Sequence, residues 1–283
     1  MRRALLFSLL VLLPSFLPAL PALRAQELTP EEFRAKRKEL EAAWAKAKTQ
    51  EEKLRILEEF KKLELTPAEL AKLETDAQNT PKTPGPEDIV AAAKKLVDER
   101  GENYGVDDPW WNVDPRHALP AGKRIGGLKG RWKCNLFGGN VLAQAGFEPP
   151  YYGNKGKGEY PNANQWFKWS DKYASKYGNK SHFNLVGELD VESLEGDARR
   201  KAIAELLKQA KPGDFIVVDH LGSAVSDGGH VRVVVENKIG EGEGTVACAQ
   251  ASYTSALVKN ETVDSFTGEE KVWILRPNVA RKP

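Results

Sequence analysis

Cys134 and His230 are the two residues of this chain whose types and positions favour a chemical reaction. Cys134 begins an apolar stretch, CNLFGGNVLAQAG, whose spacing predicts a helix that ends at Gly146. A thiol at a helix N-terminus meets the positive end of the helix dipole and unpaired backbone N–H groups, and both favour the nucleophilic thiolate. His230 begins a predicted strand far downstream. A cysteine on a helix start and a histidine on a strand start could together form a Cys–His hydrolase.

The reaction expected of this pair is attack on an amide carbonyl. His230 takes the thiol proton, the thiolate forms a thioester, and His230 then protonates the leaving amine before water resolves the thioester. Backbone N–H groups around Cys134 could stabilise the oxyanion. Two alternatives stay open. Cys134 could be a small buried core residue, as free cysteine often is, and His220 could replace His230 as the base.

These side chains need helices and a sheet to position them, and the chain after residue 86 predicts both. Helices are expected over 86–100, 134–145, 165–177 and 191–210, and strands over 215–218, 230–236, 245–253 and 271–276. Consecutive strands joined by modest loops suggest an antiparallel meander. Helices that precede a sheet in this way indicate an α+β domain.

Four short blocks in this order, CNLFGGNVLAQAG, PGDFIVVD, GGHVRVVVE and ACAQAS, resemble the NlpC-type and CHAP peptidoglycan hydrolases. The resemblance covers about residues 86–278. It implies a papain-like core of helices packed on an antiparallel sheet, with Cys134 as nucleophile and His230 as base. It also implies that Gln250 stands at the third position, where the family carries His, Asn, Gln or an acid and where it would hold the His230 ring in one tautomer.

The chain departs from the family pattern inside the cysteine helix, where the family often reads Cys-Asn-x-Phe-Val-x-Asp-Val. Here Gly138 and Gly139 stand in the middle, although each glycine costs a helix about 1 kcal/mol relative to alanine. Close packing or the approach of a ligand would explain them.

The third position of the expected triad, after the nucleophile and the base, also has alternatives. Gln250 shares a strand face with Cys248, so Cys248 could be core and Gln250 could merely cap a backbone group. Asp227 is another candidate to orient His230. A disulfide between Cys134 and Cys248, which would inactivate a catalytic Cys134, is a further open alternative.

Aromatic side chains gather in the loop-rich regions. Sugar rings stack on such side chains, so they could line a groove for a glycan and its peptide, and they could equally be core. The candidates for substrate binding are Trp110, Trp111, Tyr152 and Trp166. No recognised metal-ligand spacing and no phosphate-binding glycine loop is found, so neither a metal nor a cofactor is expected.

Residues 1–25 are typical of a secretory signal peptide. Arg2 and Arg3 precede an apolar run, and Leu23-Arg24-Ala25 is an acceptable cleavage site. The run is too short to span a bilayer, so we expect cleavage and an exported protein, periplasmic or extracellular, without a membrane anchor. The formal charge of +2 becomes −1 when the three arginines of this segment are removed. A near-neutral chain argues against a partner that is a nucleic acid.

The remaining chain divides by composition. Residues 26–79 are rich in Glu, Lys, Ala and Leu, with three capping-box helix starts and narrow apolar stripes, which indicates a helical hairpin or short coiled-coil module. This module could dock a protein partner, or it could be a spacer. Residues 80–86 form a proline-rich linker, and residues 87–283 form the predicted NlpC/CHAP-like hydrolase domain.

Together these observations predict an exported, cell-wall-associated hydrolase that uses the Cys–His pair on an amide bond of peptidoglycan. The bond would lie in the stem peptide or between the muramyl lactyl group and L-alanine. Two alternatives remain: transglutaminase-like acyl transfer with the same triad, and a catalytically degenerate domain that only binds wall fragments.

Overall fold

The computed structural model describes residues 28–63, 65–80, 82–106, 132–151, 160–220, 228–240 and 244–280. The predicted signal peptide, 1–25, lies outside these residues. The chain divides into two compact units between Lys82 and Thr83, within the segment predicted as a linker. No helix of the described part has both the length and the hydropathy that crossing a membrane requires.

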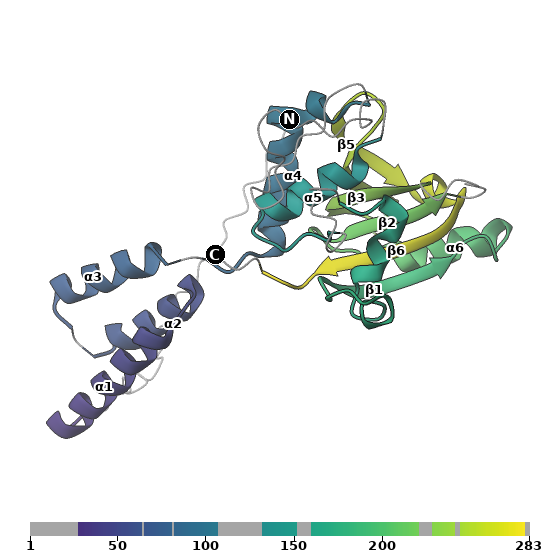
Figure 1. The fold of residues 1–283 in the computed structure, drawn as a ribbon. Coiled ribbons are helices and arrows are strands. Elements are labelled where there is room, and N and C mark those ends of the chain that lie inside the picture. The colour runs from purple at the N-terminus through teal and green to yellow at the C-terminus, as the bar shows by residue number, and fades with distance from the viewer. Residues whose placement is uncertain are drawn as a thin grey trace, which may run out of the picture. The chain divides into compact units, whose positions relative to one another are not determined.

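The N-terminal unit contains three helices, one at each of the three capping boxes in the sequence: α1 (Pro30–Lys46), α2 (Gln50–Lys61) and α3 (Pro67–Gln78) (Figure 1). Each begins with a threonine cap and a glutamate three residues later that bond each other's backbone. The core draws on α1 and α2, and Leu73 of α3 packs against it. The third helix thus covers part of the apolar surface that α1 and α2 share.

The second unit is built on a six-stranded antiparallel sheet, which confirms the predicted α+β class. Its strands are β1 (Phe183–Asp190), β2 (Phe215–His220), β3 (Gly229–Asn237), β4 (Thr245–Ala251), β5 (Ala256–Thr262) and β6 (Glu269–Pro277). The order in the sheet is β1-β6-β2-β3-β4-β5. Strands β2, β3 and β4 pair in chain order as the predicted meander requires, but β6 pairs with β1 and β2 and not with β4, so the predicted placement of 271–276 after 245–253 is wrong.

Strands β1 and β5, the two edge strands, were not predicted from the sequence. An edge strand is paired on one side only and carries more polar residues, which weakens its apolar pattern. The burial along both strands is accordingly mixed, with several intermediate or exposed positions.

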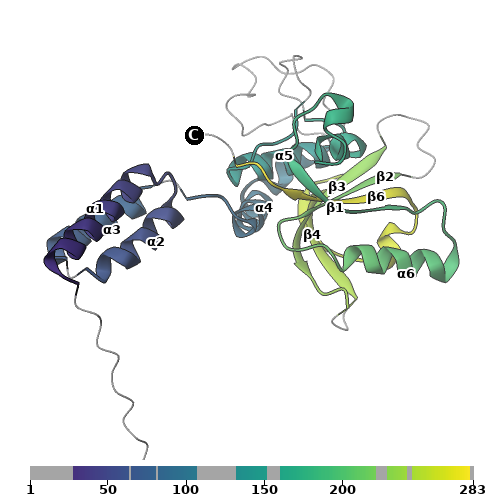
Figure 2. The same cartoon turned by 90° about the horizontal axis from the view of Figure 1, so that it is seen from below.

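Each face of the sheet is covered by helices (Figure 2). On one face lie α4 (Pro86–Arg100), α5 (Cys134–Gln144) and the 3-10 helix η2 (Ala163–Trp169), and we call this the α5 face. On the other lie α6 (Gly196–Leu207) and the 3-10 helix η4 (Val263–Phe266), and we call this the α6 face. The segment predicted as a helix over 165–177 instead forms 3-10 turns.

Candidate active site

Cys134 is the first residue of α5 and is buried, with 4% of its surface exposed. Burial raises the pKa of its thiol above the ordinary value, although hydrogen bonds from the backbone N–H groups of Val231, Asn135 and Cys134 itself act in the opposite direction. The helix start therefore favours the thiolate as expected, but burial dominates. In the resting structure Cys134 is a neutral thiol.

The two residues beside Cys134 fix the start of α5. The ammonium group of Lys133 is fully buried and donates to the backbone carbonyls of Gly105 and Val106. On the other side, the Asn135 amide donates to the carbonyl of Pro161 at 3.0 Å. These bonds tie the helix start to the segment after α4 and to the segment before η2.

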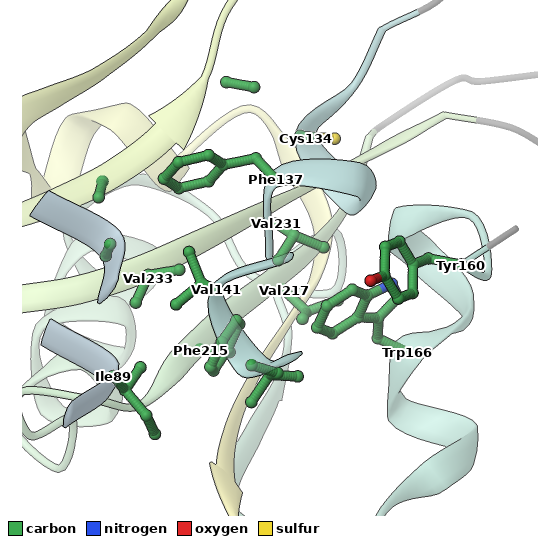
Figure 3. Packing of buried hydrophobic residues seen from close by; sticks show 14 of the residues in the cluster. Ile89, Cys134, Phe137, Val141, Tyr160, Trp166, Phe215, Val217, Val231 and Val233 are labelled. Carbon is green, nitrogen blue, oxygen red and sulfur yellow. The ribbon is translucent and has the colours of Figure 1, made fainter. Parts of the chain in front are cut away.

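The glycines inside α5 are explained by packing (Figure 3). A Cβ on Gly138 would come within 3.0 Å of both Trp166 and Val231, and a Cβ on Gly139 would come within 2.4 Å of the Tyr160 ring. A side chain at Gly138 would push α5 away from the sheet, and one at Gly139 would push it away from the segment before η2. The close approach sets the position of Cys134 relative to β3.

Strands β3 and β4 separate beside Cys134. Within the described sheet their ladder stops at the pair Val233–Ala249, so the beginning of β3 pairs only with β2 and the last two residues of β4 pair only with β5. The N–H of Val231 lies in this separated segment, close enough to the sulfur of Cys134 to lower the pKa of the thiol. The sulfur therefore lies beside the peptide bond that joins His230 to Val231.

The ring of His230 bridges the separated strands. Its Nε2 lies 2.6 Å from Oε1 of Gln250, and Nε2 of Gln250 donates to Oε1 of Glu261, also at 2.6 Å. This pairing brings together two of the predicted site residues. Gly229 lets the start of β3 lie close to β2, because a Cβ there would lie 2.7 Å from the carbonyl of Val218.

The nucleophile and the base candidates approach the separated strands from opposite faces of the sheet. Cys134 belongs to the cluster on the α5 face, whereas His230 pairs with Val218, a residue of the cluster on the α6 face. In the structure as described, Cys134 and His230 are not joined by a hydrogen bond.

The charge state of His230 follows from its surroundings. Burial lowers the pKa of His230 to about 3, and the charge of nearby Arg232 acts in the same direction. The imidazole is therefore neutral at pH 7. A neutral ring whose Nε2–H donates to Gln250 leaves Nδ1 as a proton acceptor.

His220 is the alternative base and Asp227 is the alternative residue to orient His230. His220 also lies on the α6 face, where its Nδ1 is 2.6 Å from Glu269. The hydrogen bond to Glu269 raises the pKa of His220. Asp227 lies outside the described residues, and Gln250 is the candidate that bonds the His230 ring in the described structure.

The predicted substrate-binding aromatics receive little support. Trp110, Trp111 and Tyr152 lie outside the described residues. Trp166 is fully buried, and its ring stacks on Phe183 and Phe215. A ring enclosed in this way supports the fold and cannot contact a substrate.

Two exposed aromatics next to the candidate nucleophile were missed. Trp132 and Tyr253 are 58% and 60% exposed, and their ring centroids are 5.3 Å apart. Trp132 stands two residues before Cys134, so its place in the sequence could have identified it. Tyr253 follows Gln250 by three residues in the turn after β4, and only the fold brings it to Trp132.

Both cysteines are free thiols and are buried in different clusters, Cys134 on the α5 face and Cys248 on the α6 face. Burial raises the pKa of Cys248 to about 12, which makes it unreactive. Among the described residues, no group of three or more His, Cys, Asp or Glu side chains is arranged to hold a metal ion.

No family model matches the chain, and no match is found among curated proteins or solved structures.

Proposed function

We propose that the chain is an exported cysteine hydrolase, related to the NlpC-type and CHAP enzymes with their papain-like core, that cleaves an amide bond of peptidoglycan. One observation carries the proposal. The sulfur of Cys134 lies at a helix start beside the His230–Val231 peptide bond, and His230 is held through Nε2 by Gln250. The sulfur and the His230–Gln250 pair thus reach the segment where β3 and β4 separate from opposite faces of the sheet.

The residues support a defined sequence of proton transfers. Nδ1 of His230 accepts the thiol proton of Cys134, and the sulfur bonds to the amide carbonyl carbon, whose oxygen becomes an oxyanion. The N–H groups of the first turn of α5 stabilise this oxyanion. The carbon–nitrogen bond breaks as His230 returns the proton to the amine. Water then attacks the thioester, releases the acid and regenerates the thiol.

The exposed pair of Trp132 and Tyr253 supports a glycan or peptide substrate. The flat faces of these two rings suit stacking with sugar rings. The pair lies within three residues of Cys134 and of Gln250 along the chain. The muramyl end or the stem peptide would then extend toward the sulfur.

The N-terminal three-helix unit supports a second role within this proposal, which is docking of a protein partner. Its surface is highly charged, with exposed ion pairs along all three helices. Exposed pairs of this kind add little stability, so they leave the surface charges available to a partner.

A non-catalytic wall-binding domain is a second candidate, because one observation favours it. The pKa of Cys134 is raised by burial and that of His230 is lowered, so neither group is charged at rest. Many cysteine hydrolases instead carry an activated thiolate. In that case the separated strands and the aromatic pair would bind wall fragments without cleaving them.

Digestion of purified peptidoglycan by the full chain tests the proposal. We expect soluble fragments whose masses show the addition of water across one amide bond. Cys134→Ala should reduce their release at least about a thousandfold, as loss of a nucleophile does, while Cys248→Ala should keep it. Release that persists in Cys134→Ala would remove Cys134 from the reaction, and binding without release would favour the wall-binding domain.

A further inference from the structure

Glu261 stands at the end of a hydrogen-bond chain that reaches the candidate base. It lies on β5, it is 1% exposed, and it accepts from Gln250 at 2.6 Å and from Lys259 at 3.2 Å. Burial alone would raise the pKa of Glu261, but the hydrogen bonds from Gln250 and Ser265 and the nearby positive charges lower it below its ordinary value. Glu261 is therefore a carboxylate at neutral pH.

A carboxylate fixes the direction of every bond in this chain. An ionised carboxylate can only accept, so Gln250 must turn its NH2 group toward Glu261. The carbonyl oxygen of Gln250 then faces His230, and a carbonyl oxygen also only accepts. Nε2 of His230 must consequently carry the hydrogen, which leaves the lone pair on Nδ1.

We propose that Glu261 is a positioning residue that fixes the His230 tautomer through Gln250. The inference rests on the proposed function, since the Nε2–H tautomer is the one that lets Nδ1 take a proton from Cys134. Gln250 alone cannot fix it, because an amide that is free to turn presents either its oxygen or its NH2 group to the ring. Glu261 removes that freedom.

The same face supplies a matched control. Glu269 is also a buried carboxylate, at 5% exposed, and like Glu261 it lies 3.8 Å from the guanidinium of Arg232. Its hydrogen bond goes to His220 and not to Gln250. Glu269→Gln therefore removes a charge from the same cluster without touching the chain that reaches His230.

The test is the imidazole ¹⁵N spectrum of the full chain, which reports which ring nitrogen of His230 carries the hydrogen at pH 7. We expect the wild type and Glu269→Gln to prefer Nε2–H about tenfold or more, since the deciding hydrogen bond goes to a charged group. In Glu261→Gln the new amide can present either its oxygen or its NH2 group to Gln250, so the Gln250 amide can turn. This variant should bring the two tautomers close to equal population.

Glu261→Asp is the second variant, in case the neutral substitution impairs folding. It keeps the charge that faces Arg232 and Lys259, but it withdraws the carboxylate by about 1.5 Å, beyond hydrogen-bond distance of Gln250. We expect the tautomer preference to fall here too. An unchanged preference in either variant, or Nδ1–H in the wild type, would overturn the positioning role.

The two proposals fail separately. The spectrum is recorded without substrate, so absence of peptidoglycan cleavage would refute the hydrolase and leave the tautomer result standing. In the opposite case, the wild type cleaves peptidoglycan and Glu261→Asp has the same cleavage rate and the same tautomer preference as the wild type. The hydrolase proposal would then stand, and the positioning role of Glu261 would be refuted.

Discussion

The ring of Tyr160 lies against the backbone of Gly139, so close that a Cβ on that glycine would come within 2.4 Å of the ring. Tyr160 is itself 2% exposed, and its hydroxyl donates to Asn140 at 3.2 Å. The contact fixes α5 against the segment that also binds Asn135, the neighbour of Cys134. A glycine that weakens the helix thus secures the helix start where the candidate nucleophile lies.

Gly139→Ala should destabilise the protein. Overpacking a filled core typically costs about 1–3 kcal/mol. Replacing a helical glycine by alanine gains about 1 kcal/mol, so most of the range of overpacking costs exceeds this gain. Chemical denaturation would show a lower midpoint for this variant. Gly268→Ala is the control, since a Cβ there meets nothing within 4 Å and should leave the midpoint almost unchanged. An unchanged midpoint for Gly139→Ala would mean that Tyr160 moves aside freely.

Thiol alkylation should distinguish the two cysteines. Burial raises the pKa of both, that of Cys248 to about 12, but only Cys134 lies at a helix start with backbone N–H groups around its sulfur. We expect Cys134 to react first and its rate to keep rising above pH 9, because the thiolate is the reactive form. Mass mapping of the labelled peptides measures this. A rate that is already maximal at pH 6 would show a preformed thiolate–imidazolium pair instead.

His230 should make the folded state less stable in acid. Its folded pKa is about 3, below the 6.5 of an unperturbed histidine, so the unfolded chain binds a proton first as the pH falls. The stability that His230 contributes is therefore complete above about pH 6.5 and is lost between pH 6.5 and 3, at no more than about 1.4 kcal/mol per pH unit. Urea unfolding across this range measures the slope.

His230→Asn isolates that contribution, because the other titrating groups remain. The variant should lose less stability than the wild type between pH 6.5 and 3. Equal slopes in the two proteins would show that the imidazole is charged in the folded state. His220 acts in the opposite direction, since Glu269 raises its pKa and its contribution is lost as the pH rises through that raised value.

Trp132→Ala should weaken substrate binding more than it slows the chemical step. The ring is 58% exposed beside Tyr253 and makes no hydrogen bond to Cys134 or His230 in the described structure. We expect KM for soluble muropeptides to rise up to about tenfold, because a stacked aromatic pair contributes about 0.5–1.5 kcal/mol, with kcat nearly unchanged. Tyr177→Ala removes an exposed aromatic elsewhere and serves as the control. A fall in kcat at constant KM would exclude a role in binding.

Local sequence signals predicted much of the second unit. Proline at the first position and Gly101 after the end bounded α4, and the apolar run after Cys134 predicted α5. These signals act within one helix turn, so no distant contact is needed to read them. The edge strands β1 and β5 and the return of β6 to β2 depend on pairing between distant segments, and neither periodicity nor turn residues encode it.

The sequence by itself determined the α+β class, the helix that begins at Cys134 and the strand that begins beside His230, because backbone propensities and apolar spacing are local. Only the tertiary structure decided that β3 and β4 separate beside the sulfur, that Gln250 faces His230, and that Glu261 lies behind Gln250. It also decided that burial makes the thiol and the imidazole neutral. The physical reason is that desolvation and hydrogen-bond direction depend on which distant groups surround a side chain, and no local spacing specifies those groups.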